Sequence, residues 1–231
     1  MKKILCIVAH PDDPEFFAGA TLARWAAEGN HVGYVLVTGG QKCTDRTDIT
    51  PHQLAEIREG EQRNAAAVLG ISDLRFLHYV DGELANTLEL QRDLAREIRR
   101  ARPDVVVTTD HQSIHSGSRG INHNDHRIIG LAVCDAIFPA SNNRMYFPEL
   151  LAEGFEMHRP GEIYFAGPAA PNTWVDVGDY LGLKAQAVCQ HVSQVKEPDV
   201  SKIEARFRQG TLRMKADGSV WFAEAFRRVT L

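Results

Sequence analysis

The sequence lacks any hydrophobic run long enough to cross a membrane. The apolar stretch within MKKILCIVA stops at His10, and no other stretch approaches the ~20 apolar residues that a membrane-spanning helix needs. This beginning imitates the start of a signal peptide, but its apolar part is too short. We therefore expect a cytoplasmic protein that does not associate with membranes.

Cysteine is scarce, and the four cysteines form no motif. They are far apart and include no CxxC pair, which argues against a thiolate metal site and against a redox motif. We expect reduced, mostly buried thiols at Cys6, Cys43, Cys134 and Cys189. Cys43 fits this expectation least well because it lies in a polar stretch.

An excess of positive charge is also absent. The formal net charge is -4, and the basic residues are scattered along the chain, so nothing attracts the phosphate backbone of a nucleic acid. Hydrophobic residues make up 44% of the 231 residues, which is enough to bury a substantial core. The composition predicts an ordered single domain that does not bind nucleic acid.

The chain does contain a regular alternation of short apolar strands and helical patterns. Four strands are predicted, each followed by a helix: 3–9 and 16–29, 31–38 and 52–69, 74–80 and 88–101, 103–109 and 125–138. This order predicts an α/β fold with a mainly parallel, Rossmann-like sheet, right-handed crossovers and helices on both faces. No GxGxxG follows the first strand, so dinucleotide binding has little support.

The segment from about residue 139 onward is less regular. It contains two predicted strands at 162–167 and 173–177, a predicted helix at 180–192, and a tail at 201–226 that reads as helix-rich, with Trp221 and Phe222 as core anchors. Since no Pro/Gly-rich linker separates this segment, we expect one domain over residues 1–231. In that domain, a core over 3–140 carries the smaller strands and helices of 141–231.

Two polar segments follow predicted strands. HPDDPEFF follows the first strand, and the loop of residues 108–127 after the fourth strand holds four of the ten histidines. Ligands of open parallel sheets bind outside the carboxyl ends of the strands, so we expect both segments at the functional site. His10 and Asp13 are three residues apart, as are His123 and His126, which suits a metal site built from histidine and carboxylate ligands.

The motif AHPDD, followed much later by HNDHR, resembles the PIG-L/LmbE family of metal-dependent N-deacetylases, whose usual pattern is HPDD and then HPDH. IREGEQRNAAAVLGISDLRFLHYVDGEL and KAQAVCQHVSQ are also similar to that family, so the resemblance covers most of residues 3–194. The chain departs from the pattern at Asn124, which replaces the usual proline, and at Pro14, which follows the paired aspartates.

The resemblance implies a bound Zn²⁺, or another divalent ion such as Fe²⁺ in its place. Carried over residue by residue, it makes His10, Asp13 and His126 the metal ligands. Asp12 is then the general base, and His123 stabilises the oxyanion or the leaving amine.

The resemblance and the sequence also suggest roles for residues outside the two motifs and the ligand set. Arg58 and Asp81 match family positions that contact the substrate. Asp125 could orient a ligand imidazole through its second nitrogen, or it could only cap a helix. His111, His115 and His191 have no assigned role.

The resemblance implies a hydrolase that removes an acyl group, most simply acetyl, from an N-acylated small molecule of the amino-sugar type. It also implies a homo-oligomer, because family members are often oligomeric. Three alternatives remain open at this point. Two histidines and one carboxylate also make the ligand set of ferrous oxygenases; the site could bind a metal or sugar without catalysis; and Asp12 or Asp13 could be only the N-cap of a helix.

Overall fold

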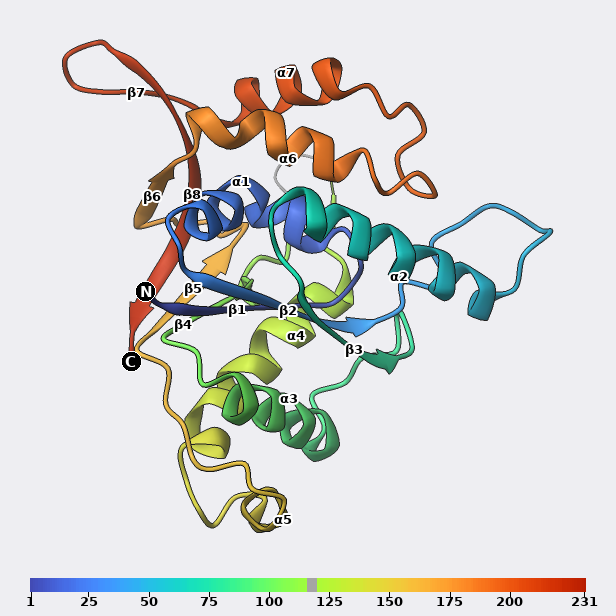
Figure 1. Ribbon diagram of the computed structural model, residues 1–231, viewed down its shortest axis with the longest axis vertical. Coiled ribbons are helices and arrows are strands. Elements are labelled where there is room, and N and C mark those ends of the chain that lie inside the picture. The colour runs from blue at the N-terminus through green and yellow to red at the C-terminus, as the bar shows by residue number, and fades with distance from the viewer. Residues whose placement is uncertain (116–119) are drawn as a thin grey trace.

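A mixed, mainly parallel sheet runs through the middle of the protein. The computed structural model describes residues 1–115 and 120–231 (Figure 1). The strands lie in the order β3-β2-β1-β4-β5-β8-β6, and β7 pairs with β8. The five parallel strands are β1 (Lys3–Val8), β2 (His31–Thr38), β3 (Asp73–Tyr79), β4 (Val105–Thr109) and β5 (Glu162–Ala166). The antiparallel strands are β6 (Thr173–Asp176), β7 (Leu212–Met214) and β8 (Val220–Thr230).

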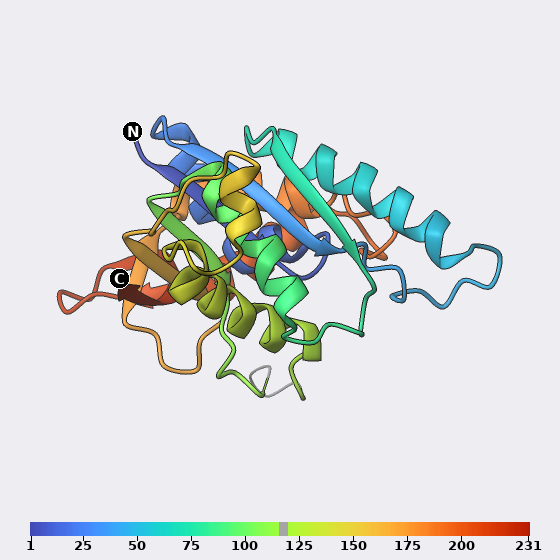
Figure 2. The ribbon, with the colours of Figure 1, turned by 90° about the horizontal axis from the view of Figure 1, so that it is seen from below.

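Helices cover both faces of this sheet. One face carries α1 (Asp13–Ala27), α2 (Pro51–Val68) and α6 (Leu181–Val188), with α7 (Val200–Thr211) packed on α6. The other face, seen from below in Figure 2, carries α3 (Leu88–Ala101) and α4 (Asn124–Asp135). Short elements complete the chain: the π-helical turn η1 (Ala136–Ser141), α5 (Pro148–Ala152) and the 3₁₀ turn η2 (Gly178–Tyr180).

The side chains of β1 show why the sheet has two buried faces. Ile4, Cys6 and Val8 pack in the cluster beneath α1 and α2. Leu5 and Ile7 point the other way and pack against α3 and α4. Because successive side chains of a strand alternate between faces, a strand covered on both sides must be apolar throughout, as the continuous run predicts.

The predicted fold class and all four β/α pairs are confirmed, with small shifts at the ends. The first helix begins at Asp13 rather than at residue 16. Pro14 lies in its first turn, where a missing N–H costs no helical hydrogen bond. The fourth helix ends at Asp135, and Phe138 in η1 is extended, with φ -141°. Extended geometry is expected for the residue before Pro139.

The prediction of a helix-rich tail over 201–226 is wrong in its second half. After α7 the chain forms β7 and the long strand β8, which lies between β5 and β6. The composition AEAFRR favours a helix, but pairing with two strands buries Ala223 and Phe226 to 1% and 0% exposure. Trp221 and Phe222, expected as core anchors, are only half-buried.

The cysteines differ in burial, and the helices are those of a protein without a membrane-spanning segment among the described residues. All four cysteines are free; Cys6 and Cys189 are buried, Cys134 is half-buried and Cys43 is exposed. Across residues 1–115 and 120–231, no helix has both the length and the apolar character needed to span a bilayer.

A buried ion pair joins β8 to the helices of one face. Lys184 on α6 donates from Nζ to Glu224 Oε1 on β8 at 2.7 Å and to the Phe16 carbonyl on α1 at 2.9 Å. Both charged side chains are only 4% exposed. The Glu224 carboxylate also accepts from the backbone N–H of Thr21 at 2.8 Å, so it ties three elements together.

We predict that Lys184→Met lowers the free energy of unfolding by about 3–5 kcal/mol, because it leaves the Glu224 carboxylate buried without its counter-charge. Urea denaturation followed by circular dichroism measures this change. Lys202→Met is the matched control: its side chain is 65% exposed and its Nζ lies 3.8 Å from its partners, so the loss should stay below about 1 kcal/mol. Equal losses in the two variants would contradict the assignment.

Candidate metal centre

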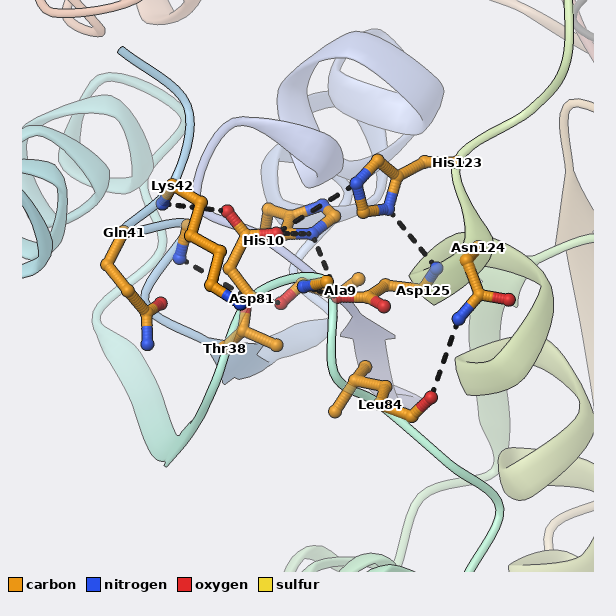
Figure 3. A network of polar contacts seen from close by, with 12 residues as sticks. Ala9, His10, Thr38, Gln41, Lys42, Asp81, Leu84, His123, Asn124 and Asp125 are labelled. Atoms are coloured by element: carbon orange, nitrogen blue, oxygen red, sulfur yellow. Dashed lines mark hydrogen bonds and ion pairs between the residues drawn. The ribbon is translucent and has the colours of Figure 1, made fainter. Parts of the chain in front are cut away.

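Polar side chains from three segments meet at the carboxyl end of the sheet. His10 and Asp13 follow β1, and Asp81 follows β3. His123 and His126 lie at the start of α4, which follows β4. The two segments expected at the functional site therefore come together. Figure 3 shows His10 beside Asp81, His123 and Asp125.

The three residues predicted as metal ligands form one compact group. One ligand atom from each of His10, Asp13 and His126 lies within 4.8 Å of the others, close enough to hold a metal ion. Asp13 Oδ1 is 3.0 Å from His126 Nε2, and Asp13 Oδ2 is 3.3 Å from His10 Nδ1. Two imidazole nitrogens and a carboxylate oxygen are a donor set that suits catalytic zinc.

The turn between β1 and α1 gives the paired aspartates different positions. Asp13 Oδ2 accepts a hydrogen bond from the His10 backbone N–H at 2.8 Å, which closes the turn. Asp12 occupies the N-cap position of α1, yet its side chain makes no capping hydrogen bond. Its φ is 94°, a left-handed conformation that costs a residue other than glycine about 1–3 kcal/mol. The N-cap alternative therefore does not account for either carboxylate.

A second contact orients His126. Its Nδ1 lies 3.0 Å from the Asn122 side-chain oxygen, which can only accept a hydrogen bond. This contact assigns the ring proton to Nδ1 and leaves the Nε2 lone pair facing Asp13. The ring of Phe17 packs edge-on against the imidazole, with centroids 5.2 Å apart.

Two further carboxylates lie behind His10. His10 Nε2 is 3.2 Å from Asp81 Oδ1 and 3.4 Å from Asp125 Oδ2 (Figure 3). Backbone N–H groups hold both carboxylates: that of Lys42 donates to Asp81 at 3.1 Å, and that of Gly82 donates to Asp125 at 2.7 Å. Asp125 thus lies beside the His10 imidazole, a position from which it could orient the ring, as the sequence predicts. Asp81, expected at the substrate, lies beside it and is only 5% exposed.

The charges of this cluster favour a bound cation. Burial lowers the pKa of His10, but the carboxylates around the ring outweigh burial and raise the pKa to about 12, with Asp13 having the largest of these effects. Burial likewise raises the pKa of Asp81, but the His10 imidazole outweighs burial and lowers the pKa to about 2. The carboxylates of Asp13, Asp81 and Asp125 surround the His10 imidazole in a region with little access to water. A divalent ion bound there would offset their negative charge.

The Asp12 side chain contacts Arg58 of α2. Its Oδ2 is 3.1 Å from Arg58 Nη2, and its side chain is 17% exposed. Burial raises the pKa of Asp12 to about 6, although the Arg58 charge lowers it. Arg58, expected to contact substrate, is only 2% exposed and also donates to the carbonyls of Gly40 and Pro11.

His123 is the most open side chain of the group, with 45% of it exposed. Its Nδ1 accepts a hydrogen bond from the Asp125 backbone N–H at 3.2 Å, so a neutral ring carries its proton on Nε2. Burial lowers the pKa of His123, and the neighbouring His10 lowers it further. The neutral ring therefore offers one N–H donor beside His10, whose ring centroid is 4.8 Å away.

The unassigned histidines lie apart from this group or behind it. His111 packs edge-on against Phe165, and His115 forms an isolated bridge with Ile121. Residues 116–119 of the predicted loop lie outside the described residues. His191 is fully buried and contacts Glu15 at 3.2 Å.

Sequence reasoning missed a buried pair near Asp12. Gln62 of α2 accepts from the Asp12 backbone N–H at 2.8 Å and donates to Glu15 of α1 at 3.0 Å. The available signal was spacing, since Gln62 follows Arg58 by four residues and so shares its face of the helix.

The family model of PIG-L, described as GlcNAc-PI de-N-acetylase, matches residues 5–137. This chain belongs to the PIG-L family. The family predicted from the HPDD and HNDHR motifs is thus confirmed.

Similar proteins agree with this assignment. A diacetylchitobiose deacetylase from Thermococcus kodakarensis is 32% identical over 197 residues, which is 85% of this chain and 72% of that protein. A 1D-myo-inositol 2-acetamido-2-deoxy-alpha-D-glucopyranoside deacetylase from Actinosynnema mirum is 28% identical over 84% of this chain and 81% of its own length. The solved structure of N,N'-diacetylchitobiose deacetylase from Pyrococcus horikoshii matches with a TM-score of 0.88 and 29% identity, covering 99% of this chain and 84% of the other.

We predict that His126→Ala weakens divalent-metal binding by at least about 100-fold, because it removes one of three ligands, and loss of an outer-shell partner alone costs about 10–100-fold. Competition with a chromogenic chelator measures the affinity. His111→Ala removes an imidazole from the neighbouring loop but none from the group, so it should bind metal like the unchanged protein. Equal affinities in the two variants would refute the role of His126.

Proposed function

We propose that this PIG-L family member is a metal-dependent deacetylase that hydrolyses the acetamido group of an amino sugar related to N-acetylglucosamine. The observation that carries the proposal is the convergence of His10, Asp13 and His126 on one point, with Asp12 on the same turn but outside that group. The deacetylase class follows from the family. The roles of the individual residues are our own assignment.

We assign the metal to His10 Nδ1, Asp13 and His126 Nε2. A second group that could hold an ion contains His10, Asp81, His123 and Asp125. Its two carboxylates, Asp81 and Asp125, already accept hydrogen bonds from backbone N–H groups and face His10 Nε2, the other ring nitrogen. They are therefore better suited to hold the Nε2 proton and so to orient the ring toward the ion.

A divalent ion at this position supplies a bound water whose pKa is lowered to about 7 in the case of zinc, and it polarises a carbonyl oxygen. The residues of the chain then have separate tasks. Asp13 would hold the ion and already accepts the His10 backbone N–H, so we do not assign it the proton transfer. Asp12 is not a ligand, and Arg58 holds only its Oδ2, so the other oxygen can take a proton from the attacking water.

His123 stabilises the negative charge that develops on the acetyl oxygen. Its Nε2–H is directed by the hydrogen bond that Asp125 donates to Nδ1, so the donor is already oriented before substrate binds. One such donor typically contributes about 10²–10³ in rate. The amine that leaves also needs a proton, which Asp12 can return.

The amino-sugar substrate is supported by the relatives. Two of them are named for deacetylation of diacetylchitobiose and of a 2-acetamido-2-deoxy-glucopyranoside, so both act on acetamido sugars. An acetate-release assay over N-acetylated mono- and disaccharides, N-acetyl amino acids and simple amides tests the proposal. We expect release from the sugars alone, loss after metal removal, and equal rates with and without oxygen. Oxygen-dependent turnover would instead indicate a ferrous oxygenase.

We also propose that residues 1–231 fold as one domain and that the protein forms a homo-oligomer. The single sheet supports the first point, because β5, β6 and β8 from the second half of the chain continue the sheet begun by β1–β4. Light scattering coupled to size-exclusion chromatography tests the second point.

We predict that Asp12→Asn lowers kcat by about 10²–10⁴, because asparagine keeps the size of the side chain but cannot accept the proton. KM and metal content should stay within about threefold, since Asp12 binds neither substrate nor metal in the ground state. Asp48→Asn makes the same chemical change at an exposed site and should retain full activity. Normal turnover by Asp12→Asn would remove Asp12 from the mechanism.

A further inference from the structure

We propose that Gln62 is a positioning residue that holds the peptide unit between Pro11 and Asp12, and so fixes the direction of the Asp12 carboxylate. The inference rests on the proposed role of Asp12 as the proton acceptor. Gln62 does not touch the metal group; it acts on the backbone of the residue that does the chemistry.

Both polar groups of this one peptide unit are held by the same face of α2. Arg58 Nη2 donates to the Pro11 carbonyl at 2.5 Å, and Gln62 Oε1 accepts from the Asp12 N–H at 2.8 Å. Residues four apart on a helix are neighbours, so the two side chains reach opposite edges of the peptide. Because a peptide unit is planar, fixing both edges fixes its orientation.

The orientation matters because Asp12 has an unfavourable backbone conformation, with φ 94° and ψ -28°. Left-handed geometry is rare outside glycine, and a free turn would relax away from it. The two helix side chains hold the turn in this state. In this state the Asp12 carboxylate makes no capping hydrogen bond and instead contacts Arg58.

A buried carboxylate fixes which way the Gln62 amide points. Gln62 Nε2 lies 3.0 and 3.1 Å from the two oxygens of Glu15, and a carboxylate only accepts hydrogen bonds. The amide nitrogen must therefore face Glu15, which leaves the amide oxygen for the Asp12 N–H. His191 Nε2 contacts the same carboxylate at 3.2 Å. Gln62, Glu15 and His191 are each 0% exposed, so water does not replace these contacts.

The first test replaces Gln62 with methionine, which has a similar length but offers the Asp12 N–H no good acceptor. We expect Gln62→Met to lower kcat at least about tenfold, as small displacements of a reacting group do, while KM and metal content stay within about threefold. Glu61→Gln is the matched control on the same helix. It alters the contact with Ser193 but leaves the peptide unit alone, so its kcat should not change.

A double-mutant cycle separates positioning from general structural support. If Gln62 acts through Asp12, then Gln62→Met should have no further effect on kcat in the Asp12→Asn background. A readout independent of activity is the exchange of the Asp12 amide proton in metal-free protein. It should speed up at least about tenfold in Gln62→Met, with the amides of core strand β2 unchanged.

A reciprocal exchange provides a rescue even if Gln62→Met does not fold. In the double variant Glu15→Gln, Gln62→Glu, the new carboxylate can accept from both the Asp12 N–H and the new amide, so the hydrogen bonds and the net charge are kept. We expect its kcat within about fivefold of the unchanged protein, and Gln62→Glu alone to be clearly worse because two carboxylates then face each other.

The possible outcomes distinguish the two proposals. If Asp12→Asn is fully active, the proposed function of Asp12 is wrong, and this inference fails with it. If Asp12→Asn is inactive but Gln62→Met keeps its kcat, or lowers kcat equally in both backgrounds, only the inference is overturned. A swapped double variant that folds but has lost activity would overturn it as well.

Discussion

The site depends on the turn between β1 and α1, where Asp13 accepts a hydrogen bond from the His10 backbone N–H at 2.8 Å. This bond brings an imidazole and a carboxylate of one turn onto the same point, so that only His126 must come from elsewhere in the chain. In the same turn Asp12 has a left-handed conformation, and its carboxylate contacts Arg58. One local constraint thus separates a group that binds metal from a group that can move a proton.

The buried strands of the sheet and two neighbouring carboxylates support this turn. The apolar strands beneath it give the centre a rigid base, because they are buried on both faces. Backbone N–H groups hold the carboxylates of Asp81 and Asp125 against His10. Their negative charges favour a positive charge on or near the His10 ring. Taking so many carboxylates out of water costs free energy, and an ion that pairs with them returns part of that cost on binding. Metal binding and the stability of this region should therefore be coupled.

The extent to which sequence predicts this structure differs between its parts. The β/α alternation and the meeting of His10 with His126 follow from periodicity and from the rule that parallel strands end at one edge. Strand β8 was misread because AEAFRR has the composition of a helix, and only its pairing with distant strands decides otherwise. Spacing places Gln62 on the same helix face as Arg58, but it does not show that this face packs against the turn and contacts Asp12. Asp81 contacts His10 because the segment after β3 reaches the turn after β1, which the sequence does not show. Such contacts between distant residues are properties of the tertiary structure and leave no local pattern.

A crystal structure of the zinc-loaded protein, with anomalous scattering recorded at the zinc edge, would locate the ion. We expect one strong peak at about 2.0–2.2 Å from His10 Nδ1, an Asp13 oxygen and His126 Nε2. We also expect Asp81 and Asp125 to remain beside His10 Nε2. A peak bound instead by His10 Nε2, Asp81 and Asp125 would show that the ion occupies the second candidate group and that Asp13 and His126 are not its ligands.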